Sequence, residues 1–238
     1  NMVFEVKYAY EDNNYNQSYA GQTTADFNAN PHQQYVGYQL GEYNTEHHTS
    51  YAKFRADINS NITNTTTGYF NYFTRDWFKL DKVVSGGSSC SLETVVSKAA
   101  TGNCGTAALN ILKGSTAGQL RYKGNDRQYG AYGIMNETDF SFNTNIFGKN
   151  IGHKLKIGYK YHYDYHHRDQ QNHNFTQAAG GLITAHASGV TASDDRKETS
   201  RGHVAYFEES ATINNFVASF GARFEHVDMH YRNGAGGE

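Results

Sequence analysis

The chain has 238 residues, of which 37% are hydrophobic and 14% aromatic, and its formal net charge is −2. The near-neutral charge gives no reason to expect a nucleic-acid partner, and the many aromatic residues argue against a disordered chain. No run of about 18 apolar residues occurs, so the sequence offers no transmembrane helix. A membrane-spanning β-strand remains compatible with this composition, because it alternates apolar and polar residues over only about 9–11 positions.

Alternation of apolar and polar residues predicts seven β-strands. In chain order they cover about 2–10, 50–58, 66–80, 127–142, 153–168, 199–213 and 216–231. The strand 153–168 has six unbroken alternations, more than the five or six residues of an ordinary strand. We expect an outward face of Leu155, Ile157, Tyr159 and Tyr161, and an inward face of Lys154, Lys156 and Lys160. After Glu225 the apolar phase changes, which predicts a β-bulge near His226.

The predicted connections alternate between short and long. Short ones fall at 59–61, 143–152 and 214–215, and long polar ones at 12–43, 81–126 and 169–198. This asymmetry is typical of the periplasmic turns and extracellular loops of membrane barrels, whereas compact soluble domains seldom carry three such loops. We therefore predict an all-β protein, a transmembrane antiparallel β-barrel with long extracellular loops. A soluble β-sandwich is disfavoured because its strands are shorter.

Three segments resemble TonB-dependent outer-membrane receptors, most closely those of the ferric-dicitrate type. Tyr-Glu-Asp at 10–12 and Ser-Tyr-Ala-Gly-Gln-Thr-Thr-Ala-Asp-Phe-Asn-Ala-Asn-Pro at 18–31 resemble the signature of the first loop. Phe-Thr-Arg-Asp-Trp-Phe-Lys-Leu at 73–80 resembles a later strand, and Phe-Gly-Ala-Arg-Phe-Glu-His at 220–226 resembles the G-x-R-x-E strand. The matches occur in family order across nearly the whole chain. Ala20 and Gln22 depart from the larger aliphatic residues expected there.

The resemblance implies a 22-stranded barrel with a plugged lumen in the outer membrane of a Gram-negative bacterium. Such a receptor imports a ferric chelate, ferric citrate or a siderophore, with energy from the TonB complex. Residues 1–238 show no energy-coupling box, plug or closing strand, so we interpret them as an internal part of the barrel domain, about seven strands long. Uptake of a nickel chelate or haem, and a passive porin or an adhesin, are the alternatives. The expected partners are membrane lipid, the chelate and, through the plug, TonB; no resident cofactor is expected.

Cations are the expected ligand contacts for a citrate complex, because arginine pairs bidentately with carboxylates. The candidate substrate-binding residues are Arg75, Arg127, His166, His167 and Arg168. Residues expected to face the lumen are Arg75, Lys79, Arg127, Lys154, Lys156, Lys160 and Arg223. The alternative is internal pairing of these cations with Glu5, Asp57, Asp139 and Glu225. Trp77 is expected in the aromatic girdle at the membrane boundary.

Histidine and cysteine supply two further hypotheses. His162, His166 and His173 form a candidate metal site, since imidazole suits iron, nickel, copper and zinc; a solvated polar loop is the alternative. Strand spacing places His162 and His166 on one face and His167 on the other. Cys90 and Cys104 are expected to form a disulfide in the oxidising periplasm, worth roughly 3 kcal/mol for so short a loop; two free loop thiols are the alternative. No catalytic motif is present, so no enzyme is predicted.

Overall fold

The seven strands predicted from the sequence are present and pair in chain order in one antiparallel sheet. The computed structural model describes residues 1–97 and 101–234, except for the side chains of 185–189. The strands along the sheet are β1 (Met2–Asn16), β2 (Glu42–Asn59), β3 (Ile62–Ser85), β5 (Gly118–Ile146), β6 (Lys149–Gln177), β7 (Ile183–Ile213) and β8 (Phe216–Asn233). A short strand that the sequence pattern did not indicate, β4 (Ser88–Ser91), pairs only with β3.

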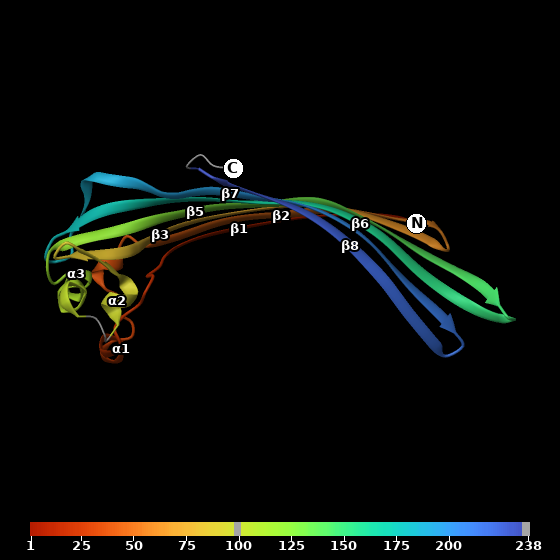
Figure 1. Cartoon of the computed structure of the whole chain (residues 1–238), viewed down its shortest axis with the longest axis horizontal. Helices are drawn as coiled ribbons and strands as arrows, with labels where there is room; N and C mark the ends of the chain where they lie inside the picture. Colours follow the sequence, from red (N-terminus) through yellow and green to blue (C-terminus); the bar gives the residue numbers. More distant parts are fainter. Residues whose placement is uncertain (98–100, 235–238) are drawn as a thin grey trace.

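The sheet is long and curved, with its helices gathered at one end and tight hairpin turns at the other (Figure 1). The described part of the chain holds no helix long and apolar enough to cross a bilayer. The turns join β2 to β3, β5 to β6 and β7 to β8, as the short connections predicted. Following this asymmetry, we call the end that carries the helices the extracellular end and the end with the tight turns the periplasmic end.

Two details of the sequence prediction were wrong. The third long loop is almost entirely strand: β6 and β7 continue toward each other and leave only residues 178–182 between them. Beyond the membrane a strand no longer needs an apolar face toward lipid, so the alternation disappears while the backbone ladder continues. The bulge near His226 is also absent, because β7 and β8 pair without a register shift. The change in the apolar pattern arises because the face of Phe224 continues with polar residues, His226 and Asp228, while the apolar Val227 and Met229 lie on the other face.

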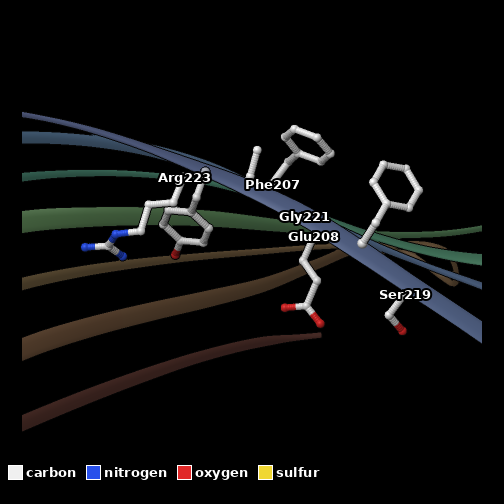
Figure 2. Close-up of a pocket in the computed structure, with 8 residues that line it drawn as sticks. Phe207, Glu208, Ser219, Gly221 and Arg223 are labelled. Atoms are coloured by element: carbon white, nitrogen blue, oxygen red, sulfur yellow. The ribbon is translucent and has the colours of Figure 1, made fainter.

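Each strand has one apolar and one polar face, and residues paired across strands share a face. The apolar face contains a belt of exposed residues: Phe54, Phe70, Ile134, Ile157, Phe207 and Phe220 are 37–63% exposed. Phe207 points to one side of the sheet and Glu208 and Ser219 to the other (Figure 2). Along β6 the register confirms that Leu155, Ile157, Tyr159 and Tyr161 share the apolar face, opposite Lys154, Lys156 and Lys160. An exposed apolar belt of this extent is typical of the lipid-facing surface of a membrane barrel.

On the polar face, one glycine makes room for an aromatic ring. A β-carbon on Gly158 would collide with the ring of Tyr206 on the neighbouring strand. The Tyr206 hydroxyl lies over this gap and donates to the Glu137 carboxylate at 2.6 Å. The glycine therefore allows a tyrosine to lie flat across the strands and reach a carboxylate two strands away.

At the extracellular end, the apolar face is covered by a small cap. Its elements are α1 (Thr24–Ala29), η1 (Val36–Tyr38), α2 (Leu92–Val96), η2 (Gly102–Cys104) and α3 (Thr106–Leu112). Ile111 and Leu112 of α3 pack with Leu120 and Tyr122 of β5, all less than 7% exposed. The predicted disulfide between Cys90 and Cys104 is present, with a Cα–Cα distance of 5.4 Å. It ties β4 to η2 beneath this core.

Polar contacts join the three extracellular connections into one unit. Lys113 forms an ion pair with Asp26 at 2.7 Å. Hydrogen bonds from Lys113, Tyr35 and Thr23 lower the pKa of the Asp26 carboxyl to about 2. The Gln39 amide donates to the Gly181 carbonyl at 2.7 Å, and the Gly180 N–H donates to the Gly114 carbonyl at 3.0 Å. The three connections therefore form one folded cap on the sheet and not three separate loops.

Candidate functional site

An unbroken row of four arginines crosses the polar face near its extracellular end. Arg75 of β3 pairs in register with Arg127 of β5, Arg127 with Arg168 of β6, and Arg168 with Arg196 of β7. Neighbouring strands lie about 4.8 Å apart, so the row is roughly 14 Å long. Like charges directly opposite each other destabilise a sheet. A row of four therefore needs compensating negative charge nearby.

A matching row of aspartates crosses the other face. Each of the four strands carries an aspartate next to its arginine, and the register aligns them as Asp76, Asp126, Asp169 and Asp195. Because adjacent residues of a strand point to opposite faces, the sheet itself separates the two charge rows. The aspartates balance the net charge at this height without covering the guanidinium groups.

The two arginines nearest β8 have acidic neighbours on their own face. Arg168 Nε lies 3.0 Å from an Asp194 carboxylate oxygen, an ion pair whose angle is not that of a hydrogen bond, and its Nη2 donates to Gln170. Arg196 Nε lies 3.7 Å from Glu198. These contacts hold the two guanidinium groups in place and reduce the charge that a ligand would meet.

Arg75 and Arg127 have no such partner. Within the described residues no carboxylate oxygen lies within 4.0 Å of either guanidinium group. Arg75 lies over the Trp77 ring, 5.7 Å from its centroid, and its Nε is buried without a hydrogen-bond acceptor. Arg127 contacts Asn125 at 3.4 Å and His166 at 3.3 Å. Both charges are therefore available to an anionic ligand.

The surroundings concentrate positive charge. Lys79 lies four residues beyond Arg75 along β3, on the same face, with its Nζ 3.7 Å from the centroid of Tyr19 and 4.2 Å from that of Trp77. Partial burial, and then the positive charges of Lys123, Arg75 and Arg127, lower the pKa of Lys79, while Asp81 opposes the shift. Partial burial likewise lowers the pKa of the Arg168 guanidinium, with neighbouring arginines adding to the effect. The arginine stays protonated.

Aromatic side chains line the row on both sides. Toward the periplasm, Tyr129 stacks on His166 with ring centroids 4.6 Å apart, and Phe73 lies 5.7 Å from Tyr129. Toward the loops, Trp77 contacts Tyr19 and Tyr43 at 5.5 and 5.6 Å. The Trp77 ring contacts Arg75 directly, and the Tyr129 ring stacks on His166, which in turn contacts Arg127. Trp77 thus belongs to this site; the expectation of a girdle position was wrong, because its register places it on the polar face.

The aspartate row predicts a pH effect on stability. Partial burial and the carboxylates of Asp76 and Asp169 raise the pKa of Asp126 to about 7, although its side chain still reaches solvent. Between pH 4 and 7 the folded state keeps a proton that the unfolded chain releases, so stability falls as pH rises through this window. Asp126→Asn should therefore stabilise the full-length protein at pH 8 and have no effect at pH 4. With solvent screening we expect about 1 kcal/mol, a rise in Tm of roughly 2–4 °C.

Thermal unfolding in detergent micelles at pH 4 and pH 8 measures this difference. Asp139→Asn is the control with the opposite sign, since Asp139 lies 3.8 Å from Lys156 and its loss removes a favourable partner. Equal stabilisation by Asp126→Asn at both pH values would show that the raised pKa has no part in it.

The structure gathers four of the five candidate binding residues on one face. Arg75, Arg127 and Arg168 stand in the row, and His166 lies two residues from Arg168, toward the periplasmic end. His167 is on the opposite face, as the spacing predicted, and pairs with Asp195 at 3.0 Å. Its assignment to the same binding surface as the others was therefore wrong. That any of these residues binds ligand stays a proposal.

The histidine metal site was also wrong as a set of three. His162 and His166 share the polar face but stand four residues apart, roughly 13 Å along the strand. His173 lies on the apolar face and packs edge-on against Phe78. Across the described residues no group of three His, Cys, Asp or Glu side chains is placed to hold a metal ion.

Internal pairing explains other cations of the polar face. Lys156 lies 3.8 Å from both Glu137 and Asp139, and Arg223 pairs with Glu225. These pairs lie at the height of the apolar belt, where the polar face also carries Arg55 bound to Asp57 at 3.2 Å. The alternative of an internal charge ladder is therefore correct for this part of the sheet.

Sequence reasoning missed Arg196. A signal was present in the sequence: the adjacent pairs Arg75–Asp76, Asp126–Arg127, Arg168–Asp169 and Asp195–Arg196 reverse their order from strand to strand, as antiparallel neighbours require. Reading that reversal as a register would have aligned all four.

The fold resembles that of a solved outer-membrane transporter. The chain aligns over 98% of its length with the ferric citrate transporter FecA in its unliganded form, at 16% sequence identity and a TM-score of 0.64. The sheet has the fold of a segment of that β-barrel. The chain spans 28% of the length of the transporter. The polar face is accordingly the lumenal face and the apolar face the outer one.

A second likeness is weaker. The siderophore receptor PiuA from Acinetobacter baumannii aligns over 97% of this chain and 36% of its own, with 13% identity and a TM-score of 0.49. No family model matches the sequence, and no curated protein matches it.

Proposed function

We propose that this chain forms part of the barrel of an outer-membrane receptor that imports an anionic ferric chelate, with ferric citrate as the first candidate. The observation that carries the proposal is the pair Arg75 and Arg127, whose guanidinium groups face the lumen without a carboxylate partner among the described residues. Ferric citrate presents excess carboxylate, which arginine binds through two parallel hydrogen bonds.

The flanking side chains support this ligand class over a directly bound metal. His166 is occupied by a stack on Tyr129, a 3.3 Å contact with Arg127 and a 3.3 Å contact with Glu198. Among the described residues no group of three or more His, Cys, Asp or Glu side chains is placed to hold a metal ion. Charge attraction, in contrast, works through a row of fixed cations that the ligand approaches as a whole anion.

Energy coupling through TonB belongs to the same proposal and rests on the resemblance of the three sequence segments. Transport against a gradient needs a plug that responds to TonB, whereas residues 1–238 contribute to the wall of the lumen. The function therefore concerns the full-length receptor.

The test measures uptake of labelled iron, supplied as ferric citrate, by cells that produce the full-length receptor and lack other ferric citrate uptake. We expect saturable uptake that stops when TonB is deleted or the proton gradient is collapsed. Unchanged uptake without TonB identifies a passive pore and contradicts the proposal. Uptake of nickel or haem in place of ferric citrate contradicts the choice of ligand.

A further inference from the structure

Arg127 is held in the arginine row by side chains on two sides of it. Its Nε donates to Asn125 at 3.4 Å, and its Nη1 lies 3.3 Å from Nε2 of His166 on the neighbouring strand. Asn125 is itself buried, and it accepts a second hydrogen bond from the buried Gln170 at 2.6 Å. A guanidinium group carries five N–H donors, so these two contacts leave about three donors for a ligand.

The contact with Arg127 defines the protonation state of His166. Because arginine can only donate, the Nε2 atom that it meets must carry the lone pair of a neutral imidazole. The proton of that imidazole is then on Nδ1, which lies 3.3 Å from a carboxylate oxygen of Glu198. Glu198 accepts the hydrogen bond from Nδ1 and so selects this tautomer. The two contacts of the ring are therefore compatible with the Nδ1–H tautomer alone.

The neighbouring strands keep the His166 ring in place. Tyr129 of β5, its partner across the strands, stacks on it with ring centroids 4.6 Å apart and 11° between the ring planes. Glu198 of β7, its partner on the other side, also lies 3.7 Å from Arg196 through its second carboxylate oxygen. We call Glu198, His166 and Arg127, which lie on three adjacent strands, the lumenal relay.

In the relay, the imidazole separates the charge of Glu198 from that of Arg127. Arg168 and Arg196 contact carboxylates directly, at 3.0 and 3.7 Å, and part of their charge is neutralised there. Arg127 instead meets a neutral ring, so the carboxylate orients it through that ring without forming an ion pair with it. The relay thus combines a fixed direction of the guanidinium group with a free positive charge.

Arg75, the neighbouring arginine, has no comparable support. It lies over the Trp77 ring at 5.7 Å, and in the part of the chain that the structure describes its Nε finds no hydrogen-bond acceptor. The two arginines that lack a carboxylate partner therefore differ, since hydrogen bonds fix the direction of Arg127 and a ring contact leaves Arg75 freer to turn. A donor that is fixed before binding loses less conformational freedom when the ligand arrives.

We propose that Glu198 and His166 are positioning residues of the chelate site. Glu198 holds His166 in the Nδ1–H tautomer, and the bare Nε2 of His166 holds Arg127 in the direction in which it meets a carboxylate of the anionic chelate. Arg127 is thereby the fixed contact of the site and Arg75 the adjustable one. The proposal rests on the function proposed above, because it concerns the same site, but it can fail while that function holds.

Two substitutions of His166 in the full-length receptor separate the hydrogen bonds of the relay from the packing of its ring. His166→Gln keeps an acceptor for Arg127 and a donor for Glu198 but loses the ring, whereas His166→Phe keeps a ring on Tyr129 but neither hydrogen bond. Equilibrium binding of ferric citrate to the purified receptor should stay within about twofold of wild type in His166→Gln. It should be about 10-fold weaker in His166→Phe, the effect of one hydrogen bond to a charged group. The reverse order shows ring packing and overturns the proposal; loss of all binding in both variants shows ligation of the metal by imidazole and also overturns it.

His162→Phe is the matched control. His162 lies on the same strand and the same face and stacks on a tyrosine, Tyr69, at 5.8 Å, but among the described residues it contacts no arginine. This variant should bind ferric citrate as the wild type does. Binding as weak as that of His166→Phe overturns the proposal, because the loss would then not depend on contact with Arg127. Resistance to unfolding in cold SDS establishes that each variant is folded.

Combination with arginine variants shows through which arginine His166 acts. His166→Phe should weaken binding by about a further 10-fold in Arg75→Gln and by nothing further in Arg127→Gln, since Arg127 is the group that it positions. Equal further loss in both backgrounds overturns the proposal. Arg127→Gln alone should weaken binding at least about 10-fold; if it does so while His166→Phe does not, only this proposal fails. If Arg127→Gln binds as the wild type does, the proposed function fails and this proposal fails with it.

Discussion

Arg75→Gln/Arg127→Gln should weaken ferric citrate binding to the full-length receptor by at least about 100-fold. Each hydrogen-bonded contact to a charged group contributes about 1.5–3 kcal/mol, so two lost arginines account for about 3–6 kcal/mol. The loss is expected here because neither guanidinium has a carboxylate partner among the described residues, and each can therefore give its full charge to the ligand. Equilibrium binding of the purified receptor measures the effect.

Two variants sharpen this experiment. Arg75→Lys/Arg127→Lys keeps the charge and loses the planar fork, so we expect an intermediate affinity and an unchanged dependence on salt. Arg55→Gln is the matched control: Arg55 lies on the same lumenal face but is paired with Asp57 at 3.2 Å, nearer the periplasmic end. It should bind ferric citrate as the wild type does.

Salt and histidine variants separate charge attraction from metal ligation. Binding that depends on the arginine row should weaken as ionic strength rises. Binding through imidazole should instead weaken below about pH 6 and be abolished by His166→Ala. His167→Ala should have no effect, since His167 lies on the outer face beside Asp195. Loss of binding in His166→Ala, with no response to salt or to the arginine changes, would mean that the proposed site is wrong.

Ile157→Lys should destabilise the inserted barrel by about 2–4 kcal/mol, the cost of a lysine on the lipid side near the membrane midplane. Ile157 is 48% exposed on the apolar belt, about midway along the predicted crossing. The reason is that a charged amine placed among acyl chains loses its hydration and gains no partner. Unfolding of the full-length protein in lipid vesicles by urea measures the change.

The same substitution on the lumenal face provides the control. Thr65 belongs to the row of Gly158, the residue next to Ile157 on β6. It pairs with Glu137 and Arg55 on the polar face. Thr65→Lys meets water and a carboxylate and should change stability by less than about 1 kcal/mol. Similar losses in both variants would contradict the assignment of the two faces.

Much of the fold could be read from local alternation, and the physical reason is the presence of two solvents. Where one face meets lipid and the other meets water, each strand must alternate, as in Leu155, Ile157 and Tyr159 against their lysine neighbours. Beyond the membrane neither face needs to be apolar toward lipid, and the signal disappears although pairing continues. For that reason the sequence pattern predicts a loop over residues 169–177 and 183–198, and a bulge near His226, where the structure has regular strands.

The sequence determined the seven main strands, their two faces, the disulfide between Cys90 and Cys104, and the lumenal orientation of Arg75 and Arg127. It also contained the four adjacent arginine–aspartate pairs. Only the tertiary structure decided that these pairs stand at one height, because a row across strands depends on register, which long-range backbone pairing sets. The same pairing excluded His173 from any site with His162 and His166, and it placed Glu198 beside His166 on the lumenal face. Residues far apart in the chain become one surface only when strand register places them side by side.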